Sequence, residues 1–400
     1  MASSSVAFFS DEQSLKLANL IGELKGEAAE GPFYTESKKV YEAGKYGDLV
    51  LRYAKTSEVL LGVQEKDLEP IYNLLIALTK DASTDVTPEV VKNIITPIVN
   101  SPADRAQSKL RILSNLYNNL PPTSSLRYEV FLAIINVAAK GDELDVLIPE
   151  LDENLNRSVN LWGVGLNQER ELYLRLSESL ESVEGLKPQA YTYRLRYLQT
   201  FESADAPTLK TATPVATQAI KDALILPSIL NFESLHNLAA VQQVKSTPLF
   251  KLLSIFLEGD LKAYREFVKK DGKGVVEKEL EGKEEVLVEK IRMLTLAGVA
   301  GREVPGEVGY EEIARELEVG EGEVEVWVIN VIRAGLIDAK MNQLKKTVVV
   351  SRSTHRTFTE REWKSLGEKL GAWKEGLKDV LKVIENAKLI RGDGGEGVVA

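Results

Sequence analysis

Residues 284–300 read EEVLVEKIRMLTLAGVA and begin the stretch that decides the fold, which ends at Phe358. Apolar residues recur at helical spacing in three segments of this stretch, 285–299, 310–317 and 323–334. Gly298 and Gly301 are expected to end the first of them, and Gly335 is expected to cap the third. Two strand-like segments follow, 336–342 and 347–351, around a turn at 343–346. Three helices followed by a hairpin are the order of a winged helix, although other small α+β units also show this order.

The third helical segment has the wrong charge for reading nucleic acid. Its start carries Glu321, Glu323 and Glu325, and its one cation, Arg333, lies near the far end. A helix that reads a duplex needs Arg, Lys, Asn or Gln directed at base edges and phosphates. The winged helix is therefore not expected to read a duplex through this helix, and its hairpin becomes the surface of interest.

The composition excludes several classes of protein. The chain has 400 residues, a net charge of -10 and no cysteine, which excludes disulfides, thiolate zinc sites and cysteine nucleophiles. The acidic balance argues against nucleic acid as the dominant partner of the whole chain. The opening residues 1–10 carry no basic residue, and no apolar run approaches the length of a membrane span. We expect a cytoplasmic protein that makes no membrane contact.

The rest of the chain is predicted to be mostly helical. Residues 1–206 contain one amphipathic segment after another, which predicts an α-solenoid of helical hairpins, interrupted by a loop over 26–47. No fixed-period repeat is present, so a globular helical bundle is the alternative. Residues 207–283 are also helical and include a hairpin in which Asp260 is placed as a helix N-cap. Together with the winged helix at 284–358 they form one predicted domain, 207–358. A C-terminal helix at 359–390 and a disordered tail at 391–400 complete the expected division.

A helical solenoid that leads into a winged helix resembles the PCI domain family, found in the proteasome lid, the COP9 signalosome and eukaryotic translation initiation factor three. Within it, three segments look like those of the M subunits of initiation factor three. They are KIRMLTLAGVA (290–300), AGLIDAKMNQLKKTVVVSRSTHRTF (334–358) and EWKSLGEKLGAWK (362–374). The resemblance covers the C-terminal third well, and the N-terminal region only in general character. The acidic, Gly-rich stretch at 301–309 departs from the family pattern.

Signals of catalysis are absent from the sequence. The two histidines, His236 and His355, lie far apart, so they do not form the paired ligands of a metallopeptidase. No GxxxxGK[ST] phosphate loop is present, and the acidic residues are scattered along helices. We therefore expect a non-catalytic protein with no cofactor, no metal and no small-molecule substrate.

Two groups of residues near the hairpin are candidates for contact. By resemblance, PCI subunits join through the sheets of their winged helices, and Val348, Val349 and Val350 suit an exposed edge strand for this purpose. A basic group on this acidic chain could contact RNA weakly, contact an acidic neighbouring subunit, or only protect the sheet edge from aggregation. Its members are Lys340, Lys345, Lys346, Arg352 and Arg356.

The C-terminal helix, from Glu360 to about residue 388, carries a heptad seam. The seam consists of Trp363, Leu366, Leu370, Trp373, Leu377, Val380 and Ile384. This seam could fold back on the chain's own winged helix. Three glycines inside the helix make it unstable alone, and its two indoles favour a partner surface. By resemblance, such helices gather into a shared bundle, which places the seam at a subunit interface.

The resemblance implies a scaffold subunit of initiation factor three that contacts other PCI and MPN subunits. Through them it would support assembly on the small ribosomal subunit during translation initiation. Two alternatives remain at this point: the corresponding PCI subunit of the COP9 signalosome, and a winged-helix adaptor that binds nucleic acid.

Overall fold

The computed structural model describes residues 11–81, 86–280, 282–302, 306–357 and 360–392. It divides into two compact units, one that extends to Val215 and one that begins at Ala216. The division at 206/207 made from the sequence stays a prediction. Within the described ranges, no helix is both long and apolar enough to cross a membrane.

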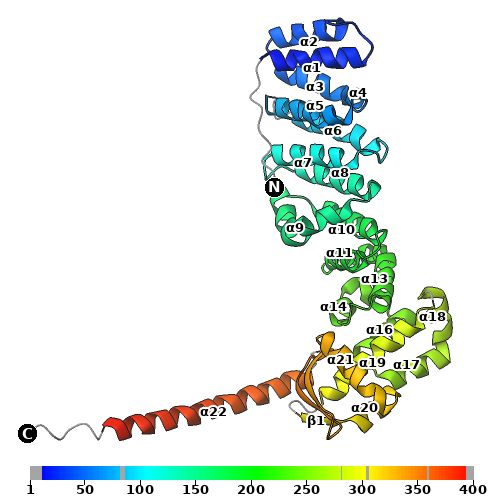
Figure 1. Ribbon diagram of the computed structural model, residues 1–400, viewed down its shortest axis with the longest axis vertical. Helices are drawn as coiled ribbons and strands as arrows, with labels where there is room; N and C mark the ends of the chain where they lie inside the picture. The colour runs from blue at the N-terminus through cyan, green and yellow to red at the C-terminus, as the bar shows by residue number, and fades with distance from the viewer. Residues whose placement is uncertain (1–10, 82–85, 281, 303–305, 358–359, 393–400) are drawn as a thin grey trace, which may run out of the picture. The chain divides into compact units, whose positions relative to one another are not determined.

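The N-terminal unit is a succession of helices in which near neighbours along the chain pack against one another (Figure 1). The apolar faces of the helices between residues 11 and 140 build one continuous core, with tyrosines such as Tyr53 and Tyr72 fully buried in it. The helices are α1 (Asp11–Leu24), α2 (Pro32–Glu42), α3 (Tyr46–Lys55), α4 (Ser57–Leu60), α5 (Glu65–Leu78), α6 (Thr87–Asn100), α7 (Ala106–Asn119), α8 (Leu126–Lys140), α9 (Ile148–Trp162), α10 (Leu166–Glu181), α11 (Lys187–Gln199) and α12 (Ala206–Thr211). This is the predicted solenoid-like series.

Helix α2 corrects the loop expected at 26–47. The glycines around it suggested a loop, but Pro32 stands in the first turn, where its missing N–H costs nothing. Phe33 is buried on the helix and the cations of Lys25 and Arg52 lie over its ring, 4.2 and 4.6 Å from the centroid. Tertiary contact therefore outweighs the local turn signal.

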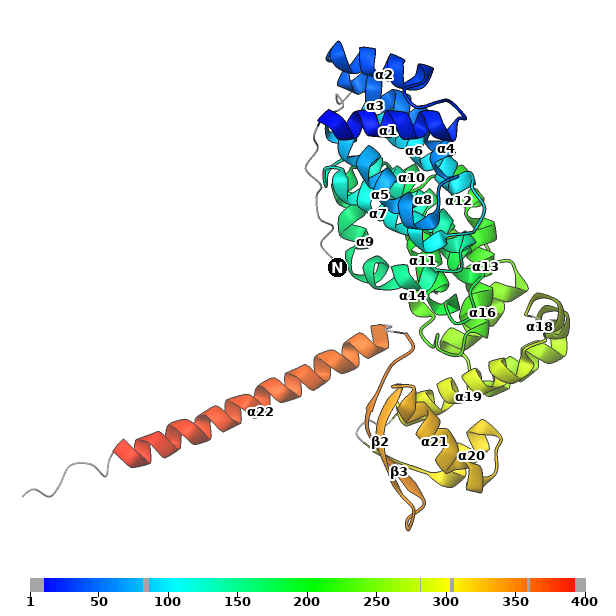
Figure 2. The ribbon, with the colours of Figure 1, turned by 45° about the horizontal axis from the view of Figure 1, so that its top comes forward.

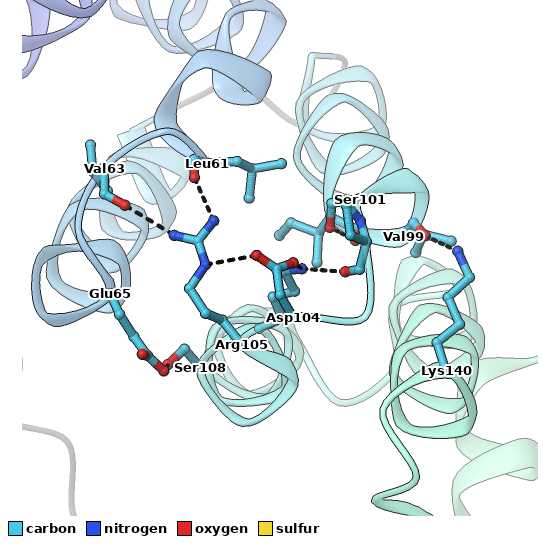
Figure 3. Close-up of polar contacts among 12 residues, drawn as sticks. Leu61, Val63, Glu65, Val99, Ser101, Asp104, Arg105, Ser108 and Lys140 are labelled. Carbon is cyan, nitrogen blue, oxygen red and sulfur yellow. Dashed lines mark hydrogen bonds and ion pairs between the residues drawn. The ribbon is translucent and has the colours of Figure 1, made fainter.

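Polar side chains join successive hairpins of this unit (Figure 3). Arg105, at the start of α7, donates from Nη1 to the carbonyl of Val63 at 3.0 Å and from Nη2 to that of Leu61 at 2.9 Å. Lys109 is buried, and its Nζ donates to the carbonyl of Pro102 at 2.6 Å and to Asp104 at 3.0 Å. The side chains of Arg105 and the buried Lys109 thus satisfy loop carbonyls that have no partner within a helix or strand.

The C-terminal unit begins with helices and ends with the winged helix. Its first helices are α13 (Thr213–Ile225), which starts just before the division, α14 (Glu233–His236), α15 (Ala239–Gln242), α16 (Pro248–Glu258), α17 (Leu261–Phe267) and α18 (Lys273–Glu279). The turn between α16 and α17 is as predicted, because Asp260 Oδ1 accepts the backbone N–H of Ala263 at 2.9 Å.

The winged helix follows, with its hairpin beside α19 and α21 (Figure 2). Its elements are α19 (Glu284–Ala300), β1 (Gly306–Gly309), α20 (Tyr310–Leu317), α21 (Val324–Arg333), β2 (Ile337–Asn342) and β3 (Thr347–Ser353). The three helices and the hairpin are as predicted, and Gly335 has the expected left-handed φ of 73°. Strand β1 was not predicted. It pairs antiparallel with β3 in register Val308↔Val348, so the sheet order is β1-β3-β2.

A buried lysine joins α19 to the end of α13. Lys290 is 1% exposed, and its Nζ donates to the carbonyls of Ala223, Leu224 and Leu226 at 2.6, 3.2 and 2.8 Å. These oxygens end α13, where the helix dipole is negative and carbonyls lack helical partners. Burial lowers the pKa of Lys290 to about 7.

Helix α22 (Glu360–Gly392) is the last element, and it extends slightly beyond the predicted end. It includes the first two residues of the predicted tail, 391 and 392. The remainder of that prediction, 393–400, lies outside the described residues.

Candidate subunit interface

The three valines predicted to form an exposed edge lie on β3 and alternate between its faces. Val348 and Val350 are buried, whereas Val349 is 38% exposed. Val349 is in register with Glu307 of β1 on one side and with Lys340 of β2 on the other. The prediction that this run is an edge is therefore wrong, because β3 is the central strand. The unpredicted strand β1 is the physical reason.

The outer edges of the sheet belong to β1 and β2. Strand β1 has four residues, with Gly306 and Gly309 at its ends, whereas β2 has six. A longer strand offers more N–H and C=O groups to a partner strand. Asp338 and Lys340 of β2 are exposed. The outer edge of β2 is therefore the better candidate for strand pairing.

Two of the five predicted basic residues are held in ion pairs. Lys346 Nζ lies 2.9 Å from Glu321 Oε2, and this hydrogen bond raises the pKa of Lys346. Arg352 Nε lies 2.8 Å from Asp338 Oδ2. Exposed pairs of this kind add little stability. They do offset the local positive charge that an RNA contact would need.

Lys340 and Lys345 are exposed, and neither forms an ion pair within the part of the chain that the structure describes. The backbone N–H of Lys345 donates to Asn342 Oδ1 at 3.2 Å in the turn between β2 and β3. A contact to RNA or to an acidic partner stays a prediction, and these two lysines are the members that the ion pairs of the described residues leave available.

Arg356, the fifth basic residue, corrects the prediction. Its Nη1 donates to the carbonyl of Gly259 at 2.7 Å and to that of Phe256 at 3.4 Å, at the turn between α16 and α17. Burial lowers its pKa. A Cβ at Gly298 would lie only 2.9 Å from Arg356 Nη2. Arg356 is therefore bound inside the unit and is not a surface contact. The prediction that Gly298 ends the first helix is wrong, because α19 continues to Ala300, and the missing Cβ of Gly298 leaves room for the guanidinium.

The seam residues of α22 are all exposed, among them Trp363 and Trp373 at 62% and 66%. No neighbouring atom crowds the three glycines at 367, 371 and 376, so close packing is not their reason. An apolar stripe of this length on one face of a helix is typical of an interaction surface. The structure brings the seam residues together on one helix, as predicted, but it does not contain what covers them.

Helix α21 carries two exposed apolar residues, Val326 and Ile329, that were not predicted as site residues. Val324, Val328 and Val331 are buried, whereas Val326 and Ile329 are exposed at 57% and 41%. VEVWVINVIR contains more apolar residues than one buried face needs, and that excess was the available signal. Val326 lies in a groove of about 620 Å³ between α19 and α21.

No group of three or more His, Asp or Glu side chains that could hold a metal occurs among the described residues. The ring of His236 lies beside that of Phe250, tilted by 32° with centroids 5.1 Å apart, and His355 is exposed. Neither histidine forms part of a catalytic arrangement in the described part of the chain.

Comparison with known proteins separates the remaining alternatives. Residues 275–352 match the family model of the PCI domain, and residues 356–384 match that of the C-terminal helix of eIF3 subunit M. "Eukaryotic translation initiation factor 3 subunit M" of Phaeosphaeria nodorum is 33% identical over 366 residues, which are 88% of this chain and 81% of that protein. This chain belongs to the family of subunit M of eukaryotic translation initiation factor 3.

Further subunit M relatives agree. The protein of Chaetomium globosum is 32% identical over 90% of this chain and 85% of its own length. That of Dictyostelium discoideum is 28% identical over 81% of this chain and 80% of its own. The subunit M helix match includes the whole α22 seam from Trp363 to Ile384. The family, the winged helix and the helix beyond it were thus predicted correctly from the sequence.

Proposed function

We propose that this chain is a non-catalytic scaffold subunit of translation initiation factor 3, held in the complex through the seam of α22. The observation that carries this proposal is the exposed apolar stripe on a helix whose sequence matches the subunit M family. The complex acts in translation initiation, so the expected compartment is the cytoplasm and the expected larger partner is the small ribosomal subunit.

The energetics of α22 favour a partner. Three internal glycines each destabilise a helix by about 1 kcal/mol relative to alanine. Helices gain most of their stability in proteins by packing an apolar face. Burial of one exposed tryptophan on this face contributes several times RT, at about 25 cal/mol per Å² of apolar area. The stripe therefore stabilises α22 only when another surface covers it, and the expected cover is a bundle with helices of other PCI and MPN subunits.

A second contact is proposed at the outer edge of β2. Unpaired N–H and C=O groups of an edge strand are satisfied when a neighbouring subunit adds a strand. Lys340 on this strand would favour a register that brings an acidic residue opposite it, whereas Asp338 is already paired with Arg352. A Val349→Pro substitution does not test this contact, since it would break the ladder of β3 on both sides.

The experiment compares variants on and off the seam. The chain is co-expressed with its neighbouring subunits, and the complex is isolated through a tag on another subunit. Trp373→Ala is expected to reduce recovery of the chain strongly, because Trp is the residue most enriched in binding hot spots.

The matched pair is Val380→Ala and Val383→Ala. Both valines are exposed on α22, at 55% and 67%, but only Val380 lies on the seam. Val380→Ala is expected to weaken retention and Val383→Ala to leave it unchanged. Equal recovery of all three variants at wild-type level would refute the seam as the contact. Loss of helical circular dichroism in the free Trp373→Ala chain would instead identify α22 as an internal strut.

A further inference from the structure

One side of α21 forms one wall of a groove here. The other wall is the N-terminal half of α19. The groove has a volume of about 620 Å³, within the range of about 300–1,000 Å³ typical of ligand sites. It lies wholly inside the C-terminal unit.

The floor of the groove is apolar. Val288 of α19 and Val326 and Trp327 of α21 line it, and Val326 is more than half exposed. Ile329 extends the apolar surface along α21. The core of the winged helix does not need these side chains, because Val324, Val328 and Val331 already fill the buried face of α21. Exposed apolar residues gathered in a concave site mark a surface for binding.

The lining of the groove is also acidic. Glu284, Glu285, Glu289 and Glu323 line it, and no Lys or Arg among the described residues forms an ion pair with any of them. Carboxylates at the start of a helix also favour its dipole, which accounts in part for Glu284 and Glu285. Glu289 lies beyond the first turn of α19, and the dipole does not explain it.

The one cation of the groove is engaged elsewhere. Arg292 Nε donates to the carbonyl of Leu317 at 3.1 Å, and its guanidinium lies 5.4 Å from the centre of the Trp327 ring. Arg292 therefore orients the indole of Trp327, and its single charge offsets at most one of the four carboxylates. The site combines net negative charge with an apolar centre.

We propose that this groove docks a basic segment of another protein, one large apolar side chain flanked by lysines or arginines. The apolar side chain would cover Val326 and Trp327, and the flanking cations would face Glu285 and Glu289. Nucleic acid does not fit, because the four carboxylates repel phosphate. They also cannot replace the counterions whose release drives such binding, since Lys and Arg side chains do that. This contact is separate from the seam of α22 and does not depend on it.

The test selects a phage-displayed library of random linear dodecapeptides on the immobilised full-length chain. The best peptide is then synthesised and titrated by fluorescence anisotropy. Enriched peptides are expected to carry Lys or Arg around an apolar residue. The double substitution Glu285→Lys/Glu289→Lys is expected to lower the affinity for the peptide by about tenfold, and Val326→Asp is expected to abolish peptide binding. Affinity for the wild-type chain should fall between about 50 mM and about 300 mM salt.

The matched control is Glu58→Lys/Glu202→Lys, which makes the same charge change at two exposed positions outside the groove. It should keep wild-type affinity within about twofold. Absence of enrichment, enrichment of acidic peptides, or equal weakening by the control would overturn the proposal. Two further results would overturn it. If the chain self-associates and Val326→Asp dissociates it, a second copy occupies the groove. If a labelled RNA binds and Val326→Asp removes that binding, the ligand is a nucleic acid. Circular dichroism verifies that each variant is folded.

Discussion

The substitution Lys290→Met is expected to change how the stability of the C-terminal unit depends on pH. The folded pKa of Lys290 is about 7, well below the unfolded value of 10.5. Between these values the unfolded chain binds more protons than the folded chain, so stability rises with pH. From pH 7 to pH 9 the gain amounts to about 2 kcal/mol, at 1.36 kcal/mol for each pKa unit. Methionine fills a similar volume without a titrating group, so the variant should lack this gain.

The same substitution removes the donor to three carbonyls at the end of α13. An unsatisfied buried acceptor costs about 1–3 kcal/mol, and at pH 9 this loss dominates because the wild-type amine is then neutral. At pH 7 the wild-type protein also carries most of the cost of burying this amine, which is about 5 kcal/mol for the whole shift from 10.5 to about 7. The two stability curves should therefore approach one another, or cross, as pH falls from 9 to 7.

Urea unfolding, followed by tryptophan fluorescence and far-UV circular dichroism from pH 7 to pH 9, measures both curves. This window lies above the range of histidine and below that of tyrosine. Lys251→Met, at an exposed position on α16, is the control and should run parallel to wild type. If Lys290→Met also ran parallel, the three carbonyls and the dipole of α13 would be holding the proton on Lys290, and the reasoning would be wrong.

Three other outcomes are expected. Arg356→Ala should destabilise the C-terminal unit by about 1.5–3 kcal/mol. Gly298→Ala should lower the free energy of unfolding less in the Arg356→Ala background than in wild type. An additive double-mutant cycle would contradict the 2.9 Å approach of a Cβ at Gly298 to Arg356 Nη2. Burial raises the pKa of Tyr264 to about 12, so its contribution to stability is complete below pH 10 and lost as pH rises through 12, by about 1.4 kcal/mol at pH 11. Tyr264→Phe should reduce the alkaline loss in denaturation curves and leave stability at pH 7 intact, because the hydroxyl has no hydrogen-bond partner among the described residues. A labelled single-stranded RNA should bind weakly and be released by about 200 mM salt. Lys345→Ala should reduce this binding and Arg356→Ala should leave it unchanged; reduced binding by Arg356→Ala would contradict the internal position of that side chain.

Local signals in the sequence were sufficient for most of the fold. The cap at Asp260, the left-handed Gly335 and the apolar periodicity of 310–317 each act through residues only a few positions apart, and each appears in the structure as predicted. Such features follow from backbone geometry and helix capping, which a sequence displays directly.

The misses have a different physical character. Strand β1 has four residues, two of them glycine, so no alternating pattern marks it, and only its pairing with β3 makes it a strand. Arg356 stands among exposed basic residues in the sequence, yet its partner carbonyl belongs to Gly259, nearly a hundred positions earlier. Contacts at that separation depend on the whole fold. The helix that carries the seam was therefore predicted correctly from its spacing, and its role as an interface stays a prediction, whereas the sheet was predicted poorly because strand pairing decides it.

The apolar stripe of α22 also bears on the life of the chain outside its complex. A newly made copy presents two indoles and a row of aliphatic side chains to the cell until partners arrive. Chaperones and proteases recognise such exposed surface, and what they remove depends on how long it stays uncovered. Copies made in excess of their partners should be degraded, which would match the amount of this protein to that of its complex without any regulation of its synthesis.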